Sequence, residues 1–207
     1  MTVLEIKPAR KHLTSISFDN GETVLLDNDT VYENCIKAKS DLTEEKVKEL
    51  KEDSDYRRAK SRALWYLDRM PLTEKALYEK LVKAGFSGSA SAKVLAKFVE
   101  LGLIDDCRFA ENFAAFCAER NISKREIKQK MYLKGVPREI SERVLENLDQ
   151  SEEDQIKALI ATKYKTKITA ENGIQKVYAA LIRKGFSFSA VRAALKQYSE
   201  ELEYSEE

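Results

Sequence analysis

The sequence has few histidines and cysteines, two residue types that enzymes often use for acid–base, covalent or metal chemistry. It contains one histidine, His12, and three cysteines, Cys35, Cys107 and Cys117, without CxxC spacing. This odd set fits neither a zinc site nor a disulfide framework, so we expect buried, reduced thiols. It also lacks GxGxxG, a phosphate-binding loop, HExxH and GxSxG. We therefore predict no catalytic residue, no metal site and no cofactor.

Long apolar runs and an excess of one charge are missing as well. No stretch approaches the roughly 18 apolar residues that a membrane helix needs, and no charged-then-apolar leader is present. We therefore expect a cytoplasmic protein that does not enter a membrane. The 36 basic and 35 acidic residues give a net charge of only +1 at pH 7. Net charge alone therefore indicates no polyanionic partner.

Glycine is also scarce, and three of the seven glycines mark a repeat. Gly85, Gly135 and Gly185 lie in similar phrases, which are LVKAGFS at 81–87, MYLKGVP at 131–137 and LIRKGFS at 181–187. Apolar residues keep the same register, at positions 77, 127 and 177 before the glycines and at 95, 145 and 195 after them. A fixed period of 20–50 residues is typical of repeat proteins.

Each repeat is expected to contain three short helices. Thr73, Ser123 and Gly173 stand twelve residues before the glycines, and all three are permitted N-cap residues. Each of the three glycines is expected to end a helix in the left-handed conformation. We predict repeats at 57–104, 105–150 and 151–207, arranged as an elongated rod. The acidic C-terminal end of the third repeat is interpreted as a solubilising cap, with a binding tail as the alternative.

The second repeat has the clearest local signals. Residues 123–126 form a capping box, and Asp105 and Asp106 suit a helix N-terminus better than a metal site. The expected inward face consists of Phe109, Phe113, Phe116 and Cys117. The fold class is therefore mainly α.

Residues 1–56 are expected to form a separate segment, a small β-hairpin followed by helix. The run 13–18 alternates, residues 19–21 read Asp-Asn-Gly, and 23–26 supplies the returning strand. Residues 3–6 also read as strand. A short helix around 31–38 and an acidic helix around 43–56 follow. The acidic face indicates either a solvated linker between domains or a contact surface.

Basic residues gather in two places. Between 120 and 138 a single acid, Glu126, accompanies seven basic residues, which are Arg120, Lys124, Arg125, Lys128, Lys130, Lys134 and Arg138. On a helical wheel Lys124, Arg125, Lys128 and Tyr132 form one arc. Such an arc can contact phosphates or an acidic protein groove, although a lysine-rich solvated face is the alternative.

The second basic stretch covers residues 57–69, where Asp68 is the only acid. Its basic members are Arg57, Arg58, Lys60, Arg62 and Arg69. Trp65 is expected to pack against a neighbouring element, with an exposed partner-binding tryptophan as the alternative.

Glycine turns between helices also occur in helix-turn-helix DNA readers. The scarcity of asparagine and glutamine on these helices disfavours sequence-specific reading.

Three stretches resemble the RecX regulatory proteins, bacterial modulators of the RecA recombinase. They are ALWYLDRMPLTEKALYEKLVKAGF (63–86), LGLIDDCRFAENF (101–113) and IKQKMYLKGV (127–136). The most specific portion is Leu-Ile-Asp-Asp at 103–106 followed by Phe-Ala at 109–110. The resemblance is strong over 57–148 and weaker elsewhere. Where the family's second repeat often carries Gly-Pro before its middle helix, this chain has Ile122-Ser123.

The resemblance implies a non-enzymatic regulator of DNA repair and recombination. It would bind along the RecA–single-stranded DNA filament and inhibit ATP hydrolysis, strand exchange and filament growth. The expected partners are the RecA filament and single-stranded DNA, reached directly or through the filament, and the chain is expected to be a monomer. The predicted contact residues are Lys124, Arg125, Lys128, Tyr132 and Lys134, assisted by Arg57, Arg58, Arg62 and Lys80. A stand-alone, non-specific nucleic-acid-binding module is the alternative, and an inert scaffold is a third.

Overall fold

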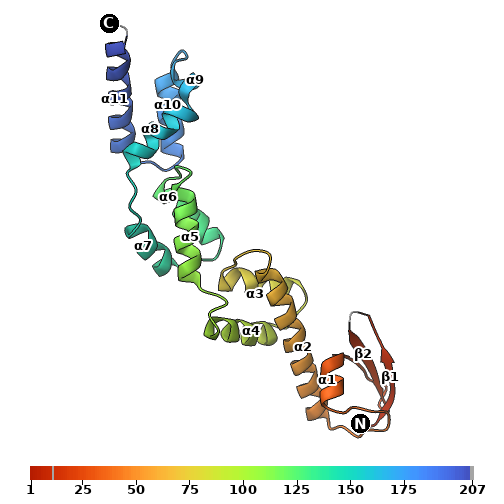
Figure 1. The fold of residues 1–207 in the computed structure, drawn as a ribbon. Coiled ribbons are helices and arrows are strands. Elements are labelled where there is room, and N and C mark those ends of the chain that lie inside the picture. Colours follow the sequence, from red (N-terminus) through yellow and green to blue (C-terminus); the bar gives the residue numbers. More distant parts are fainter. Residues whose placement is uncertain (11, 206–207) are drawn as a thin grey trace. The chain divides into compact units, whose positions relative to one another are not determined.

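The structure, a computed structural model, describes the backbone of residues 1–10 and 12–205 and side chains as far as residue 199. Within these residues, three strands precede eleven helices, and the chain divides into two compact units, Met1–Ile104 and Asp105–Glu207 (Figure 1). The predicted fold class, mainly α with three three-helix repeats after a small β segment, is confirmed.

The N-terminal strands form one antiparallel sheet. They are β1 (Val3–Pro8), β2 (Leu13–Phe18) and β3 (Thr23–Asp27), in the order β1-β2-β3. The predicted hairpin is present as β2 and β3, with Gly21 in its turn at φ +82°. The sheet buries Ile16 and Phe18 in the same core as Leu50 of the following helix. This packing stabilises a hairpin that would be marginal alone in water.

The two helices after the sheet differ from the sequence prediction. Helix α1 (Asn28–Glu33) is shorter and begins earlier than expected, because Asp27 caps it by accepting from the Thr30 amide at 3.1 Å. Helix α2 (Glu44–Leu67) is continuous, so the expected break near residue 56 is wrong. No proline or glycine lies between its ends, and nothing in the sequence stops the helix.

The first repeat consists of the C-terminal half of α2 with α3 (Glu74–Lys83) and α4 (Gly88–Glu100). Leu77, Leu81 and Phe98 are fully buried in its core. Gly85 ends the α3 segment at φ +92°, as predicted. Ser87 caps α4, and its amide and hydroxyl both donate to the Asp55 carboxylate, at 3.0 and 2.5 Å. This pair fastens α2 to α4.

The second repeat contains α5 (Asp106–Ala118), α6 (Lys124–Leu133) and α7 (Arg138–Glu146). Asp105 caps α5, as expected, by accepting from the Arg108 amide at 2.9 Å. The expected inward position of Phe116 is wrong, because its ring is 51% exposed under the guanidinium of Arg120. Small side chains such as Ala114 occupy the buried stripe of α5 instead.

The third repeat contains α8 (Glu152–Thr162), a short α9 (Lys165–Ile168), α10 (Gly173–Arg183) and α11 (Phe188–Ser205). The expected N-cap at Gly173 is wrong, because Gly173 is the first residue of α10 and Asn172 precedes it at φ +55°. Glu152 accepts from the amide and hydroxyl of Ser187, as Asp55 does from Ser87. The acidic side chains expected to cap the C-terminus, at 200–207, lie outside the described side chains.

The cysteines are all free, but only Cys117 is buried. Burial raises the pKa of its thiol. Cys107 is half-buried and Cys35 is exposed, so the expectation of three buried thiols is wrong for these two. Cys35 follows α1 in a surface turn at φ +48°, where no core is available to it. Among the described helices, none combines the length and apolar character needed to cross a membrane.

Candidate partner-binding surfaces

The predicted basic arc lies on α6 in the second unit. Ile127 and Met131 are fully buried and fix the inner face of the helix. Ser123 fixes its start, because the buried hydroxyl accepts from the Glu126 amide at 3.2 Å. The arc residues therefore project from an anchored helix. Arg125, Lys128, Tyr132 and Lys134 are exposed, and Lys124 is half-buried.

Only half of the predicted capping box forms at this helix. The Glu126 carboxylate does not complete it but lies 3.3 Å from Lys130 Nζ and 3.9 Å from Lys184 Nζ. Lys184 belongs to the third repeat, so Glu126 contributes to the joint between repeats. The single acid counted in the basic stretch is thus already paired.

Lys128 is not a free cation. Its Nζ lies 2.8 Å from the carboxylate of Glu142 on α7, which Arg138 also contacts at 2.9 Å. Glu142 accepts hydrogen bonds from Lys128 and from Arg138. Both lower the pKa of Glu142, that from Lys128 the more, and keep its carboxylate ionised. The positive charge of the arc is therefore concentrated at Lys124 and Arg125, which have no ion-pair partner within the described residues.

Arg125 also lies at the joint between the second and third repeats. A Cβ placed on Gly185 would be 3.0 Å from Arg125 Cβ and 3.0 Å from Ser123 Oγ. The Ser123 hydroxyl donates to the backbone carbonyl of Lys184 at 2.5 Å. The start of α6 thus contacts the glycine turn after α10. The aliphatic stem of Arg125 packs there, while its charged group can serve another contact.

The second basic group lies in the first unit, mostly along α2. Arg57 forms a two-pronged ion pair with Glu33, one contact of which is 2.9 Å. The hydrogen bond that Arg57 donates to Glu33 raises the pKa of Arg57 above its usual value. Arg57 therefore fastens α1 to α2, and its charge is largely neutralised.

The other predicted residues of this group lie over aromatic rings. Arg58 is 5.7 Å from the ring centre of Phe86, and Lys80 Nζ is 5.3 Å from that of Tyr66. Arg62 is 5.3 Å from the ring centre of Trp65. Such cation–π contacts hold the side chains over apolar surface without neutralising their charge.

Trp65 is the clearest residue whose position was predicted wrongly. Its side chain is 46% exposed, whereas packing against a neighbour was expected. The guanidinium of Arg69 lies over the indole at 3.7 Å from the ring centre, and Tyr66 meets its edge. Arg62 and Arg69 stand three residues before and four after Trp65. This helical spacing was the sequence signal for the two cation–π contacts.

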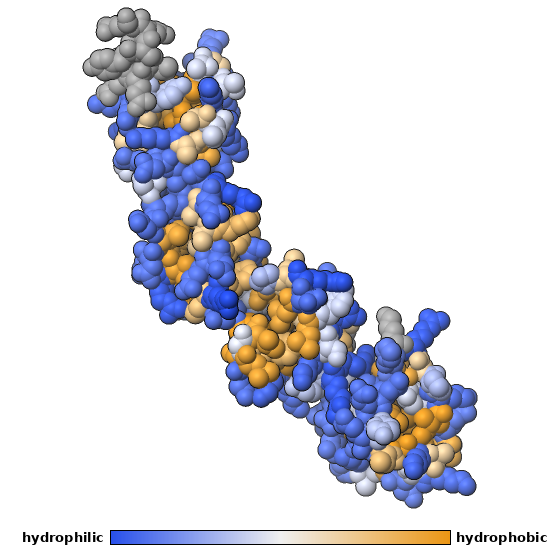
Figure 2. Space-filling model, in the orientation of Figure 1, coloured by the Kyte–Doolittle hydropathy of each residue, from blue (hydrophilic) through white to orange (hydrophobic). Residues whose placement is uncertain are grey.

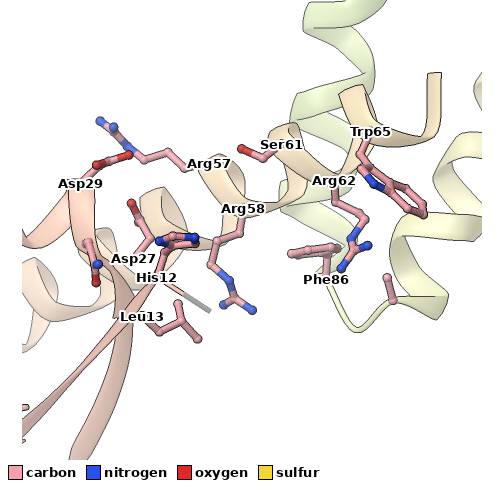
Figure 3. Close-up of a pocket in the computed structure, with 12 residues that line it drawn as sticks. His12, Leu13, Asp27, Asp29, Arg57, Arg58, Ser61, Arg62, Trp65 and Phe86 are labelled. Atoms are coloured by element: carbon pink, nitrogen blue, oxygen red, sulfur yellow. The ribbon is translucent and has the colours of Figure 1, made fainter. Parts of the chain in front are cut away.

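A groove of about 700 Å³ opens beside these residues in the first unit (Figure 3). Arg58, Arg62, Trp65 and Phe86 line one part of it. Residues at the end of the sheet and the start of α1 line the rest, among them His12, Leu13, Asp27 and Asp29. The groove brings together residues from the sheet, α2 and the turn after α3.

Neither surface has the composition of a metal centre. Within the described residues, no group of three or more histidine, cysteine, aspartate or glutamate side chains could hold a metal ion.

Apolar side chains are exposed as well. Figure 2 shows an apolar area over α3 and α4, whose exposed large apolar side chains are Tyr78, Val82 and Val99.

Comparison with known families identifies the repeats. Models of the first, second and third three-helix domains of RecX match residues 59–98, 105–145 and 151–195, in that order. Together they cover more than half of the chain. The chain belongs to the RecX family. The three matches fall on the three helical repeats described above.

Relatives named regulatory protein RecX match almost the whole chain. That of Clostridium beijerinckii is 27% identical over 202 residues, which cover 95% of this chain and 94% of the relative. That of Listeria monocytogenes is 26% identical over 215 residues, covering 100% of this chain and 78% of the relative. A regulatory role follows from membership in this family.

Solved RecX structures share the fold. A crystal structure of regulatory protein RecX is 20% identical, has a TM-score of 0.67, and is matched over 93% of this chain and 98% of that chain. RecX from Lactobacillus salivarius is 23% identical with a TM-score of 0.60, covering 69% and 96%. The N-terminal sheet and the repeats therefore belong to a known RecX architecture.

Proposed function

We propose that this chain binds the filament that the RecA recombinase forms on single-stranded DNA. It acts there as an inhibitor of ATP hydrolysis, strand exchange and filament growth, in the cytoplasm and as a monomer. The observation that carries the proposal is the ordered match of three RecX domains to three consecutive repeats. The protein performs no reaction itself.

The α6 arc supplies the central contact in this proposal. Lys124 and Arg125 stand on an anchored helix and keep their charge, so they can meet the phosphates or acidic side chains of a filament. Tyr132, 74% exposed, and Lys134 extend the surface along α6. Lys128 contributes less than the sequence indicates, because it is paired with Glu142, whose single negative charge it shares with Arg138.

Contacts from more than one repeat strengthen binding to a polymer. Arg58, Arg62 and Lys80 belong to the first repeat and the arc to the second. Individually weak contacts that are linked in one chain bind a repeating target with higher avidity. Arg57 is assigned a supporting role, because its ion pair with Glu33 holds the first unit together.

The experiment removes charge from the arc without removing bulk. We expect Lys124→Gln combined with Arg125→Met to weaken binding to RecA-coated single strands about 2- to 30-fold, at roughly 0.2–1 kcal/mol per exposed charge contact. Methionine keeps the Arg125 stem that packs at Gly185. Binding is measured by fluorescence anisotropy of the labelled protein titrated with filament.

A charge-matched control uses Lys163→Gln with Lys167→Gln, two exposed lysines at the end of α8 and within α9. This pair removes the same charge and is expected to bind as the wild type does. Equal affinity of the arc variant and the wild type, with both folded by circular dichroism, contradicts the role of the arc.

A further inference from the structure

The groove in the first unit combines charge that the filament proposal already uses with an aromatic side chain that it leaves unused. It carries positive charge at Arg58 and Arg62, and within the described part of the chain neither has an ion-pair partner. It also carries a large aromatic side chain, Trp65, that is 46% exposed. Arg69 and Arg62 lie over the indole at 3.7 and 5.3 Å from the ring centre, and part of this apolar ring still meets water, which is unfavourable. Both features point to a ligand that is both anionic and aromatic.

The volume and lining of the groove restrict the ligand further. About 700 Å³ lies within the range of roughly 300–1,000 Å³ that small organic groups occupy in proteins. Figure 3 shows the side chains of Arg58 and Arg62 leaving α2 on the side where Phe86 lies, with Trp65 beyond them. Cationic side chains and aromatic rings thus alternate along one wall of the groove. Phosphates and bases alternate in the same way along a nucleic-acid strand.

We propose that this groove docks single-stranded nucleic acid. One base stacks at Trp65, and neighbouring phosphates contact Arg58 and Arg62. Base stacking on an aromatic side chain inside a basic groove is the general means by which proteins hold single strands without reading sequence. The inference deepens the proposed function, on which it rests, by assigning the DNA strand of the filament to the first unit.

An acidic protein segment is the other class of ligand with negative charge. It would pair with Arg58 and Arg62 but would supply no ring for Trp65. The exposed carboxylate of Asp29 on the same groove repels glutamates and phosphates alike, so it does not decide between the two ligands. Trp65 does decide, because only a base supplies a ring that can stack on the indole. The chemistry of the groove therefore favours nucleic acid.

Trp65 makes the test direct, because it is the only tryptophan in the chain. We expect a short oligothymidylate to quench its fluorescence in a saturable way, since a stacked base contacts the indole. With two phosphates bound, the logarithm of the affinity should fall with the logarithm of salt concentration at a slope of about −1.4. A glutamate-rich peptide of equal charge should leave the fluorescence unchanged.

Variants separate stacking from charge, with binding measured by anisotropy of a labelled oligonucleotide. Trp65→Leu should weaken binding roughly 5- to 150-fold, and Trp65→Phe, which retains a ring, should recover most of it. Arg58→Gln with Arg62→Gln should weaken binding and flatten the salt dependence. Normal circular dichroism of each variant excludes unfolding as the cause.

The outcomes distinguish this inference from the filament proposal. Quenching by oligothymidylate without any binding to RecA-coated strands supports the groove and contradicts the proposed function. Filament binding without quenching, with Trp65→Leu binding as the wild type does, overturns the groove and leaves the proposed function standing. Quenching by the acidic peptide in place of the oligonucleotide also overturns the inference.

Discussion

We expect Phe98→Ala to lower the free energy of unfolding of the first unit by about 3–5 kcal/mol, the usual cost of removing a buried phenylalanine. Phe98 is 1% exposed and heads the largest fully buried side chains among the described residues. It belongs to α4 and packs in the same core as Leu77 and Leu81. The loss is a large fraction of a typical domain stability of about 5–15 kcal/mol.

Hydrogen exchange measured by mass spectrometry can locate this effect. Amides of α3 and α4 should exchange much faster in the variant, while those of α6 and α7 should change little, because they belong to a separate compact unit with its own core. The matched control is Phe188→Ala, whose ring is 65% exposed and whose loss should cost about 0.5 kcal/mol or less. Equal destabilisation by both variants would contradict the core described here.

Gly173→Ala is expected to destabilise the third repeat by about 3 kcal/mol or more, at or above the upper end of ordinary overpacking. A Cβ at this position would lie well inside van der Waals contact with the backbone carbonyl oxygens of Lys167 and Ile168. These atoms belong to α9, so they cannot move aside as a flexible side chain can. Urea denaturation of the full chain measures the loss.

Gly88→Ala provides the control for this backbone clash. Gly88 is also the first residue of its helix, α4. Its added Cβ would meet only the hydroxyl of Tyr78, at 3.1 Å, and this exposed side chain can rotate away. The expected change is about 1 kcal/mol or less in either direction. Similar losses for the two alanine variants would show that helix position, and not contact with α9, determines the cost.

The repeats were predictable because their signals are local. A glycine that must adopt positive φ and a hydroxyl or carboxylate that caps a helix act within a few residues, as at Gly135 and Ser123. The buried stripe follows from helical periodicity, so Ile127 and Met131 lie inside as expected. The hairpin was predictable for the same reason, since its turn needs only Gly21 and its neighbours.

Features that depend on long-range contacts were not predictable. The local sequence allows α2 to continue past residue 56, but that its first half packs on the sheet and its second half on the first repeat follows only from the tertiary contacts. Gly173 looks like an N-cap by register, but an additional helix, α9, precedes it, Asn172 takes the cap position, and Gly173 lies against the carbonyls of α9. The sequence around residue 56 and around Gly173 carries no pattern that indicates these contacts with the sheet or with α9.

The candidate surfaces show the same division between local and long-range information. The α6 arc follows from helix geometry, but the partner of Lys128, Glu142, comes from the next helix and lies four residues beyond the basic stretch. The sequence prediction that Trp65 packs against a neighbouring element is wrong, because a helical wheel gives the direction of a side chain and not what lies there. Its exposure and the groove beside it emerge only from the packing of α2 against the sheet and α3.

The most direct test of the proposed function compares two forms of the same oligonucleotide. The labelled protein is titrated with naked single-stranded DNA and with the same strand coated by RecA, and RecA ATP hydrolysis is followed in the coated sample. The account predicts binding to the coated strand at least about tenfold tighter, a difference of roughly 1.4 kcal/mol, together with inhibition of hydrolysis. Equal or tighter binding to the naked strand with unchanged hydrolysis would contradict it.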